Sequence, residues 1–496
     1  MAISGILNTN TSALNTINAL NSTQGSLNTY LQQLSTGKSI NGPANNPAGY
    51  AIAQRFQTQI NGLNQAVSNG NQGVSLVQTA TGAIQNQTSL LQQIRTTAVQ
   101  AANASNTSQD RQALQGVVSQ LLAQVQTIAT QTQFNGQNLL DGTFSGAQFQ
   151  VGSNANQIIN VSISNSQSNA IGNNTLASSG TVYSTNGAFT NGGYTLGSAF
   201  TISSGGGNFT AGSVSISGSA GAGSVTVAAD ESANNIAASV NAVSQSTGVT
   251  ATATNSVAFT VTSGSFAFSL SNGTSGAASN TVNISANVTG VNPTGLSGLV
   301  SAINNSTAQT GVAASVNSSN QLVLTQSNGQ NMLFSGFGGS GTLAAGGTAS
   351  TTLSSGTGEG VALVQGAVQF QSTQGYALSG GSKIGLKDIS SLTAVSTVNV
   401  STAAGAQQAI SVVDQAINTL NQQNGALGAI QNRIQASVAN DQTTATNLQS
   451  AQSVVQDANI AQATSQMTKY QILQQAGIST LAQENSLQQS FLKLIP

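Results

Sequence analysis

Side chains able to do chemistry are scarce in this sequence. His and Cys are both absent, so the chain cannot build a Ser-His or Cys-His nucleophile or the usual zinc site. Asp230 and Glu231 form the one adjacent acidic pair, but neighbouring side chains on a strand point apart. The surrounding stretch ADESANNIAASV is instead typical of a helix start, where the helix dipole stabilises acidic side chains. We therefore expect no enzyme activity, no catalytic residue and no metal or cofactor site.

Glycine-rich stretches are the other candidates for chemistry, because such loops can bind phosphate. The sequence has GGGNF at 205–209 and GFGGSG at 336–341. A phosphate loop also needs a usable cation, and no Lys or Arg stands between Arg111 and Lys383. We expect both stretches to be loops or tight turns.

Charged residues make up 4 % of the 496 residues, against about 25 % in an average globular protein. The net charge is −1, which leaves no cationic surface for nucleic acid or for an anionic membrane. There is no run of about 18 apolar residues, so no transmembrane helix is expected. The first stretch, MAISGILNTNTSALN, has no basic region and the first charge is Lys38, so we expect no cleaved secretory signal.

Three parts of the chain differ in pattern. Residues 1 to about 142 and about 405 to 496 are helical in pattern, whereas the part between them is rich in Gly, Ser, Thr, Asn and Val. We predict a discontinuous multi-domain chain that is mainly α at both termini, with paired long coiled-coil-like helices, and has a variable β-rich or α+β centre. The expected domains are a terminal helical domain (1–42 with 456–496), a second helical domain (43–172 with 385–455) and an outer β-rich domain (173–384).

Apolar residues recur at seven-residue spacing in both helical parts, which favours helices packed along one another. Near the C-terminus the repeat runs Val413, Leu420, Leu427, Ile434, Asp441, Leu448 and Val455. The apolar residues that we expect to form the helix cores and the assembly contacts are Ile6, Ile17, Leu20, Leu27, Leu31, Leu34, Phe56, Leu63, Val77, Ile84, Leu91, Leu420, Leu427, Ile434, Leu448, Val455, Leu473, Leu481, Leu487, Phe491 and Leu494. For any single helix, the alternative is the core of an ordinary helical bundle.

Both ends of the chain form a helical pattern with an apolar side and almost no charge. In ILQQAGISTLAQENSLQQSFLKLIP (472–496) only Glu484 and Lys493 are charged. The first helical stretch is weakly built, because Asn10 and Gln24 take core positions in its repeat. Such helices are not stable alone in water. We therefore expect the N-terminus to be disordered in the monomer and to become ordered by association, and we expect the same of the C-terminal helix at 472–496.

The central part has the alternating pattern of strands. QFQVGSNANQIINVSI (148–163) predicts a β-hairpin. An internal repeat follows, in which residues 236–255 match residues 299–318 at an offset of 63 positions. We predict two related small α+β units, each with a short helix, a turn and strands. The alternative is a disordered low-complexity linker.

Longer motifs at both ends resemble those of the bacterial flagellins. The stretch LQQLSTGKSINGPANNPAGYAIAQRFQTQINGLNQAVSNGNQGVSLVQTATGAI (31–84) and the turn QTQFNG in 131–142 are similar to the flagellin N-terminal region. ALGAIQNRIQASVAN (426–440) and QILQQAGISTLAQENSLQQSFLKLI (471–495) are similar to the flagellin C-terminal motifs. The resemblance covers roughly residues 1–172 and 385–496. The centre resembles flagellins only in its general character and not in specific motifs.

The resemblance implies a structural subunit that polymerises into the bacterial flagellar filament and serves motility. In that family the paired terminal helices line the central channel, and subunits leave the cell unfolded, without a cleaved signal, to assemble at the tip. The implied location is the extracellular filament. The implied partners are many copies of the same chain, an export chaperone, a filament cap protein and hook-associated junction proteins, with no nucleic acid and no membrane.

One segment departs from the family pattern. The segment read by the flagellin-sensing Toll-like receptor of animals usually has the form LQR-[IV]-REL. Here it is LQQIRTT (91–97), with Leu91, Gln92, Gln93, Arg95, Thr96 and Thr97 at the positions compared. Arg95 is kept, but Gln93 replaces an arginine and a Thr-Thr pair replaces Glu-Leu. Because Arg is a common interface anchor, we expect weak or no recognition by that receptor.

Three alternatives stay open. A hook–filament junction protein shares the terminal architecture of a flagellin. A surface adhesin would use the Gly-, Ser- and Thr-rich centre, but it would normally carry a signal peptide and would not need heptads at both termini. An enzyme inserted in the centre is disfavoured by the missing His and Cys.

Overall fold

The computed structural model describes residues 10–178, 181–185, 209–228, 231–274, 277–345, 352–353 and 361–492. The chain divides into two compact units. Unit 1 comprises Met1–Thr81, Phe144–Ile163 and Gly425–Pro496, and unit 2 comprises Gly82–Thr143 and Ser164–Asn424. The long helices α2 (Pro47–Ala102) and α8 (Ala403–Gln456) contribute residues to both units. None of the helices in the described ranges is long and apolar enough to cross a membrane.

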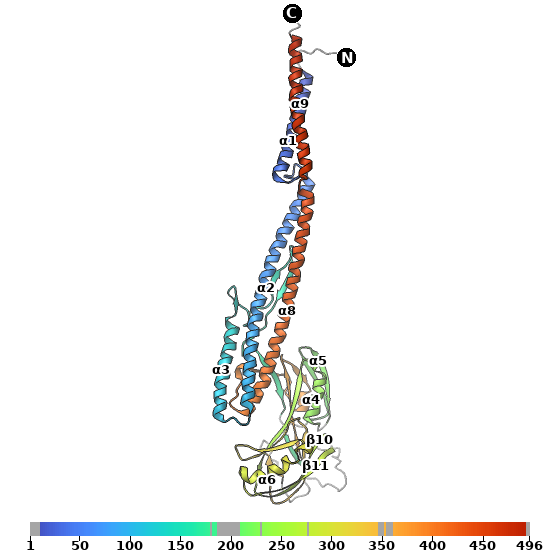
Figure 1. The fold of residues 1–496 in the computed structure, drawn as a ribbon. Helices are drawn as coiled ribbons and strands as arrows, with labels where there is room; N and C mark the ends of the chain where they lie inside the picture. Colours follow the sequence, from blue (N-terminus) through green and yellow to red (C-terminus); the bar gives the residue numbers. More distant parts are fainter. Residues whose placement is uncertain are drawn as a thin grey trace. The chain divides into compact units, whose positions relative to one another are not determined.

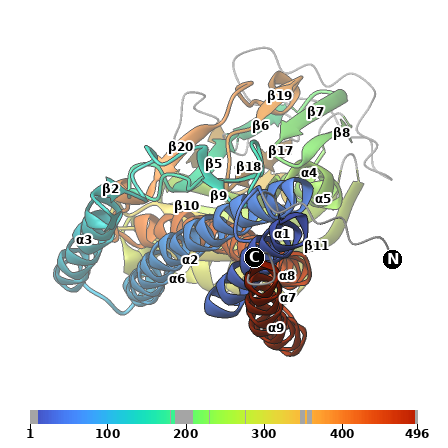
Figure 2. The same ribbon diagram turned by 90° about the horizontal axis from the view of Figure 1, so that it is seen from above.

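The terminal helices of unit 1 run side by side. Helices α1 (Thr11–Thr36) and α9 (Ile460–Leu492) pack along each other, as both views show (Figures 1 and 2). The side chain of Asn10 caps α1 by accepting a 2.9 Å hydrogen bond from the backbone N–H of Ala13. The interpretation of Asn10 as a core position was therefore wrong, because a polar residue at a helix start can have core spacing and still serve as a cap.

A short junction connects the terminal helices to α2 and α8 within unit 1. The backbone N–H of Ser39 donates to Gln456 at 2.7 Å, and that of Ala458 donates to Gly37 at 2.9 Å. Lys38 and Asp457 form an isolated antiparallel β-bridge between the two connections. Side chains add to these backbone bonds, because the hydroxyl of Ser39 donates to the carbonyl oxygen of Gln456 at 3.1 Å and the amide of Gln456 donates to that of Ile40 at 3.3 Å.

Helices α2 and α8 also pack on each other in unit 1, with a β-hairpin against them. A Cβ atom on Gly70 of α2 would lie 2.4 Å from Cγ2 of Val438 on α8, so the two helices approach closely at this glycine. Strands β3 (Ala147–Gln150) and β4 (Ile158–Val161) form the antiparallel hairpin expected from the sequence. It is anchored to α2 where the side-chain amide of Asn69 donates to the carbonyl oxygen of Gln150 at 3.2 Å.

In unit 2, helix α3 (Ser108–Gln131) lies against α2. It begins at a capping box in which Thr107 and Asp110 exchange hydrogen bonds, and these bonds lower the pKa of Asp110. The buried amide of Gln87 on α2 donates to the carbonyl oxygen of Val125 at 3.1 Å. After α3, β1 (Gln133–Phe134) and β2 (Gln137–Asn138) form a small hairpin.

The rest of unit 2 is built from three sheets. Their described strand orders are β11-β10-β14-β17-β6, then β12-β13-β9-β18-β5-β20 with β15 paired to β9 and β16 paired to β15, and β19-β7-β8. The strand bounds are β5 (Gly172–Ala177), β6 (Thr181–Thr185), β7 (Gly212–Gly218), β8 (Gly221–Val227), β9 (Thr250–Val261), β10 (Gly264–Thr274), β11 (Ala277–Val288), β12 (Val312–Val316), β13 (Leu322–Gln326), β14 (Asn331–Gly338), β15 (Leu343–Ala345), β16 (Thr352–Leu353), β17 (Val361–Gln365), β18 (Ala367–Ser372), β19 (Ala377–Ser379) and β20 (Ser391–Ala394). Short 3-10 helices η1 (Gly381–Ile384) and η2 (Val395–Thr397) flank β20. The observed architecture is thus helical at both ends of the chain and β-rich in its centre.

The two copies of the internal repeat adopt the same local structure. The first contains α4 (Ala233–Ala242) and α5 (Ser244–Thr247), and the second contains α6 (Pro293–Asn304) and α7 (Thr307–Thr310). Asn241 exchanges two hydrogen bonds with the backbone of Ala251, at 2.9 and 2.8 Å. Asn304 makes the same pair of bonds with Ala314, at 3.0 and 2.7 Å. Each copy therefore clamps its helix to the following strand with one amide. Their apolar faces pack into two separate cores, one around Phe370 and one around Phe334.

The close approach at Gly70 gives a prediction for unit 1. Replacing Gly70 by Ala forces a Cβ into Val438, so we expect the free energy of unfolding to fall by about 1–3 kcal/mol. Gly425→Ala on α8 is the matched control, because nothing lies within 4 Å of its added Cβ. That variant should be neutral or gain up to about 1 kcal/mol of helix propensity. Urea unfolding followed by circular dichroism measures both. Equal stability of the two variants would contradict the close packing.

Candidate assembly surface

The helix pair α1–α9 exposes an unusual number of large apolar side chains. Within this pair the exposed residues are Leu14, Ile17, Leu31, Ile460, Ile472, Leu473, Ile478 and Leu487. Their exposed fractions run from 39 % for Ile17 to 62 % for Ile472. Only Ala13, Leu27 and Ala463 are buried among the apolar residues described on the two helices. We call the eight exposed residues the apolar surface of α1–α9.

The contacts between α1 and α9 include an aromatic stack, two side-chain hydrogen bonds and the apolar packing of Leu20 near Gly477. Tyr30 and Tyr470 stack with their ring centroids 5.6 Å apart. The hydroxyl of Thr16 donates to the carboxylate of Glu484 at 3.1 Å. The amide of Gln474 donates to that of Gln24, so Gln24 lies on the surface in an amide pair and not in an apolar core. A pair held in this way leaves most of its apolar side chains available for further contacts.

The structure places the predicted residues of the terminal helices in three groups. Leu27 is buried, and Leu20, Leu34 and Leu481 are half-buried. Ile17, Leu31, Leu473 and Leu487 are exposed. Ile6 and Leu494 lie outside the described residues, and so does the side chain of Phe491.

The predicted residues on α2 and α8 are more buried than those on the terminal helices. Those buried in unit 1 are Leu63, Val77, Leu427 and Ile434, and those buried in unit 2 are Ile84, Leu91 and Leu420. Phe56, Leu448 and Val455 are half-buried. Sequence reasoning missed Val454, which is 87 % exposed, together with the exposed Ile52 and Ile460. Val454 lies one position after Ser453 and just before the repeat residue Val455, so seven-residue spacing alone could not single it out.

Charged residues are nearly absent from the two helices that carry the apolar surface of α1–α9. Helix α1 carries no charged residue, and the described part of α9 carries only Lys469 and Glu484. The ammonium of Lys469 lies 5.9 Å from the centroid of the Tyr470 ring. Because like charges are nearly absent, identical copies of this surface can approach one another without repulsion.

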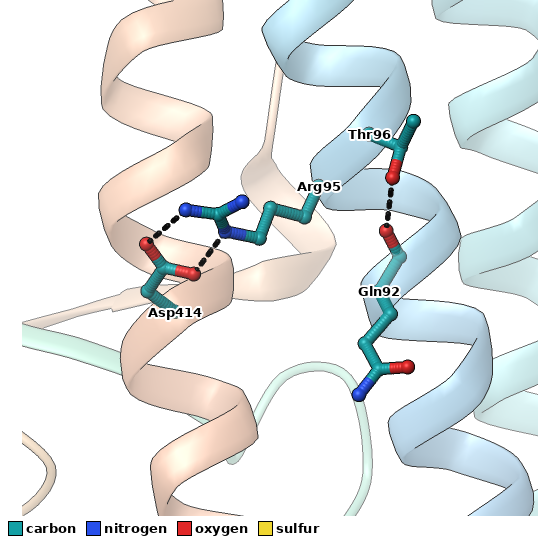
Figure 3. A network of polar contacts seen from close by, with 4 residues as sticks. All are labelled: Gln92, Arg95, Thr96 and Asp414. Atoms are coloured by element: carbon teal, nitrogen blue, oxygen red, sulfur yellow. Dashed lines mark hydrogen bonds and ion pairs between the residues drawn. The ribbon is translucent and has the colours of Figure 1, made fainter.

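A separate polar contact in unit 2 involves the segment 91–97. Arg95 on α2 forms the one ion pair found among the described residues, with Asp414 on α8 (Figure 3). Its Nε lies 2.5 Å from Oδ1 and its Nη2 lies 3.4 Å from Oδ2. The hydrogen bond to Asp414 raises the pKa of Arg95. Both side chains remain partly exposed, at 46 % and 40 %.

The neighbours of Arg95 turn their polar groups back on their own helix. The hydroxyl of Thr96 donates to the backbone oxygen of Gln92 at 3.0 Å (Figure 3), and that of Thr97 donates to Gln93 at 2.9 Å. Leu91 is buried, whereas Gln92 and Gln93 are exposed. The surface of this segment is therefore made of amides, one engaged guanidinium and hydroxyls that are already hydrogen-bonded.

The residues first considered for chemistry take structural roles where they are described. The carboxylate of Glu231 accepts a 2.8 Å hydrogen bond from the backbone N–H of Ala228, and α4 begins beyond it with Ser232 as its cap. Asp230 and residues 205–208 lie outside the described residues. GFGGSG forms the end of β14 and the turn after it. No cluster of acidic side chains that could hold a metal ion occurs in the described ranges.

Comparison with known proteins gives consistent matches at both ends of the chain. Residues 7–145 match the bacterial flagellin N-terminal helical region, and residues 410–495 match the bacterial flagellin C-terminal helical region. Residues 266–328 match the flagellin hook IN motif, which overlaps the second copy of the internal repeat.

Individual relatives are similar over the whole length. A B-type flagellin of Pseudomonas aeruginosa is 35 % identical over 99 % of both chains. A flagellin B of Vibrio anguillarum is 28 % identical over 99 % of both chains. Among solved structures, FliC from Burkholderia pseudomallei is 21 % identical, with 73 % of this chain and 99 % of that chain covered and a TM-score of 0.30. The full-length match to the Pseudomonas relative, together with the two terminal regions, shows that the chain belongs to the bacterial flagellin family.

Proposed function

We propose that the chain is the structural subunit of a bacterial flagellar filament and serves motility, with no catalytic role. The main support for this function is the apolar surface of α1–α9. It lies on two helices from opposite ends of the chain that pack on each other. Exposed large apolar side chains gathered on one helix pair with almost no charge are typical of a contact with another molecule. In a filament that molecule is another copy of the same chain.

The energetics favour many contacts of moderate strength. Fully burying a Leu or Ile side chain contributes about 1.5–3 kcal/mol. The exposed residues of α1–α9 already bury part of their area, so each would gain less than this on association. The gain must exceed the cost of losing translational and rotational freedom, which is at least about 4 kcal/mol. Several such residues acting together suffice, and each subunit in a filament has more than one neighbour.

Membership of the family supports further proposals about partners and location. We infer that the subunit is exported unfolded, without a cleaved signal, and is assembled at the tip of an extracellular filament. Its partners would be an export chaperone, a filament cap protein and hook-associated junction proteins. The absence of Cys suits this route, because an unfolded chain without thiols cannot become cross-linked on the way.

Filament formation by the purified protein tests the proposed function. We expect the full-length chain to form filaments visible by negative-stain electron microscopy, and a chain truncated after Lys469 to stay monomeric. The truncation removes most of α9, and with it four residues of the apolar surface. Filaments from both chains would show that α9 is not the assembly element. Monomers from both, even with preformed filament seeds added, would contradict the proposed function and favour a junction protein.

Point variants separate contacts between copies from contacts within one chain. Leu473→Ser and Ile478→Ser alter side chains that are 44 % and 53 % exposed. We expect each to change the stability of the monomer by less than about 0.5 kcal/mol and yet to slow filament growth strongly. Leu63→Ala is the contrasting variant, because Leu63 on α2 is buried and its loss should destabilise the monomer by about 2–5 kcal/mol.

The measurements for these variants are thermal unfolding of the monomer and seeded growth followed by light scattering. Normal filament growth by both serine variants would show that the apolar surface is not the contact between copies. Destabilised serine-variant monomers would show that these residues belong to the core of the chain.

We also propose that the Toll-like receptor recognises this chain weakly or not at all. Gln93 and the Thr96-Thr97 pair replace charged or apolar residues of the usual segment, and Asp414 engages Arg95. A partner that needs the guanidinium must first displace that carboxylate.

Receptor-reporter cells test this proposal. We expect the wild-type chain to activate them less than a standard flagellin does. The triple variant Gln93→Arg, Thr96→Glu, Thr97→Leu should raise the response, because it restores the usual segment. The same triple variant carrying Arg95→Ala is the matched control and should lose the gain. A wild-type response equal to that of a standard flagellin would refute the proposal.

A further inference from the structure

Asp441 occupies an apolar position of the α8 repeat, with Ile434 seven residues before it and Leu448 seven residues after it. The residue is only 6 % exposed, and no other Asp, Glu, Lys or Arg of the described chain lies in the buried core. Its Oδ2 atom has no hydrogen-bond partner within the described residues. A buried carboxylate without a partner is costly, so its presence at this position needs an explanation.

The elements packed against this part of α8 offer no titratable group. One turn before Asp441, Val438 packs on Gly70 of α2, and the hydroxyl of Ser437 donates to Val151 beside the β3–β4 hairpin at 3.3 Å. Residues 56–94 of α2 contain no Asp, Glu, Lys, Arg, His, Tyr or Cys. The same is true of residues 142–163, which include the whole hairpin. We call this packing of α2, α8 and the hairpin in unit 1 the α2–α8 seam.

The nearest charges lie along the helices and not across the seam. Arg433 precedes Asp441 on α8 by about two turns, roughly 12 Å along the axis. Arg55 on α2 lies between Ala53 and Gln57, both of which accept hydrogen bonds from Gln452. Gln452 follows Asp441 by about three turns, roughly 16 Å. Charges at such separations are largely screened by salt, so they compensate the Asp441 carboxylate only weakly.

Burial therefore sets the protonation of this group. It raises the pKa of Asp441 above its usual range, because the charged form is disfavoured in the apolar seam. A group whose pKa is higher in the folded than in the unfolded chain stabilises the fold while both states are protonated, below a pH of about 3.9. This contribution declines as pH rises and is lost once pH passes the pKa of the folded chain.

We propose that Asp441 is a pH-responsive element that tightens the α2–α8 seam in acid and loosens it at neutral and alkaline pH. The neutral carboxyl packs within the apolar row, whereas the carboxylate favours opening of the helices to water. This inference goes beyond the proposed function and does not depend on it, because it concerns helix packing within one chain. The carboxyl groups of Asp110 and Asp141, each hydrogen-bonded to a threonine, change the stability of the fold with pH in the opposite direction. Hydrogen bonds from Thr107 and Thr143 lower the pKa values of the two groups, so the stability they contribute is lost only below a pH of about 3.9.

Hydrogen exchange of the full-length, unpolymerised chain between about pH 3.5 and pH 8 tests the proposal, after correction for intrinsic exchange rates. The readout is protection of peptides from residues 56–81 and 425–456, with peptides from 403–424 as an internal reference. In the wild type we expect protection of the seam to fall as pH rises, by about tenfold for each unit by which folding raises the pKa. Asp441→Asn should remove most of this dependence and be the better protected at pH 8.

Two further variants keep the test decisive. Asp441→Leu completes the apolar repeat and should also be better protected than wild type at pH 8 and show no fall with pH. Asp388→Asn removes an exposed carboxylate in unit 2 and should leave the pH dependence of the seam unchanged. The proposal is overturned if Asp441→Asn keeps the wild-type pH dependence, or if both Asp441 variants are less protected than wild type at pH 8.

Discussion

The shortage of charge is the constraint on which the rest of this structure depends. The chain has 9 basic and 10 acidic residues in 496, and its described part contains one ion pair. Helices and sheets must therefore be joined by apolar burial and by amide and hydroxyl hydrogen bonds. Gln87, Asn69 and the repeated Asn241 and Asn304 supply such bonds between elements. Each contributes only about 0.5–1.5 kcal/mol net, so stability is spread over many weak contacts.

The same constraint shapes the surface that copies of the chain would share. Charged side chains usually keep exposed helices apart in solution, and α1–α9 has almost none of them. Helices α1 and α9 pair through stacked tyrosines, paired amides and the buried Leu27, and several of their other apolar side chains remain exposed. A surface of this kind favours association without fixing one partner by charge, so its specificity must come from the shape of the helices.

Much of the helical architecture could be predicted from the sequence, because seven-residue spacing reports directly on which side chains face a neighbouring helix. The hairpin of β3 and β4 was also predictable, since its strands are adjacent in the chain. The pairing of β9 with β13, β15 and β18 was not, because register between distant strands is absent from any local pattern. The ion pair of Arg95 and Asp414 joins residues 319 positions apart, and Asn10 was misread because a cap and a core residue can have the same spacing. The placement of Asp441 in the repeat was visible in the sequence, but its isolation from every titratable group across the seam required the structure.

The junction between the terminal helices and the α2–α8 pair has a consequence for how such a chain can vary. Its hydrogen bonds join backbone atoms of Gly37 and Ser39 to those of Ala458 and Gln456. Backbone bonds survive most side-chain replacements, but they require the two connections to keep the same length. Many side-chain replacements should therefore be tolerated here, except at Gly37, whose φ of 72° favours glycine. The insertion or deletion of a single residue in either connection would instead shift every bond out of register. The length of the two connections, together with this glycine, therefore constrains the junction.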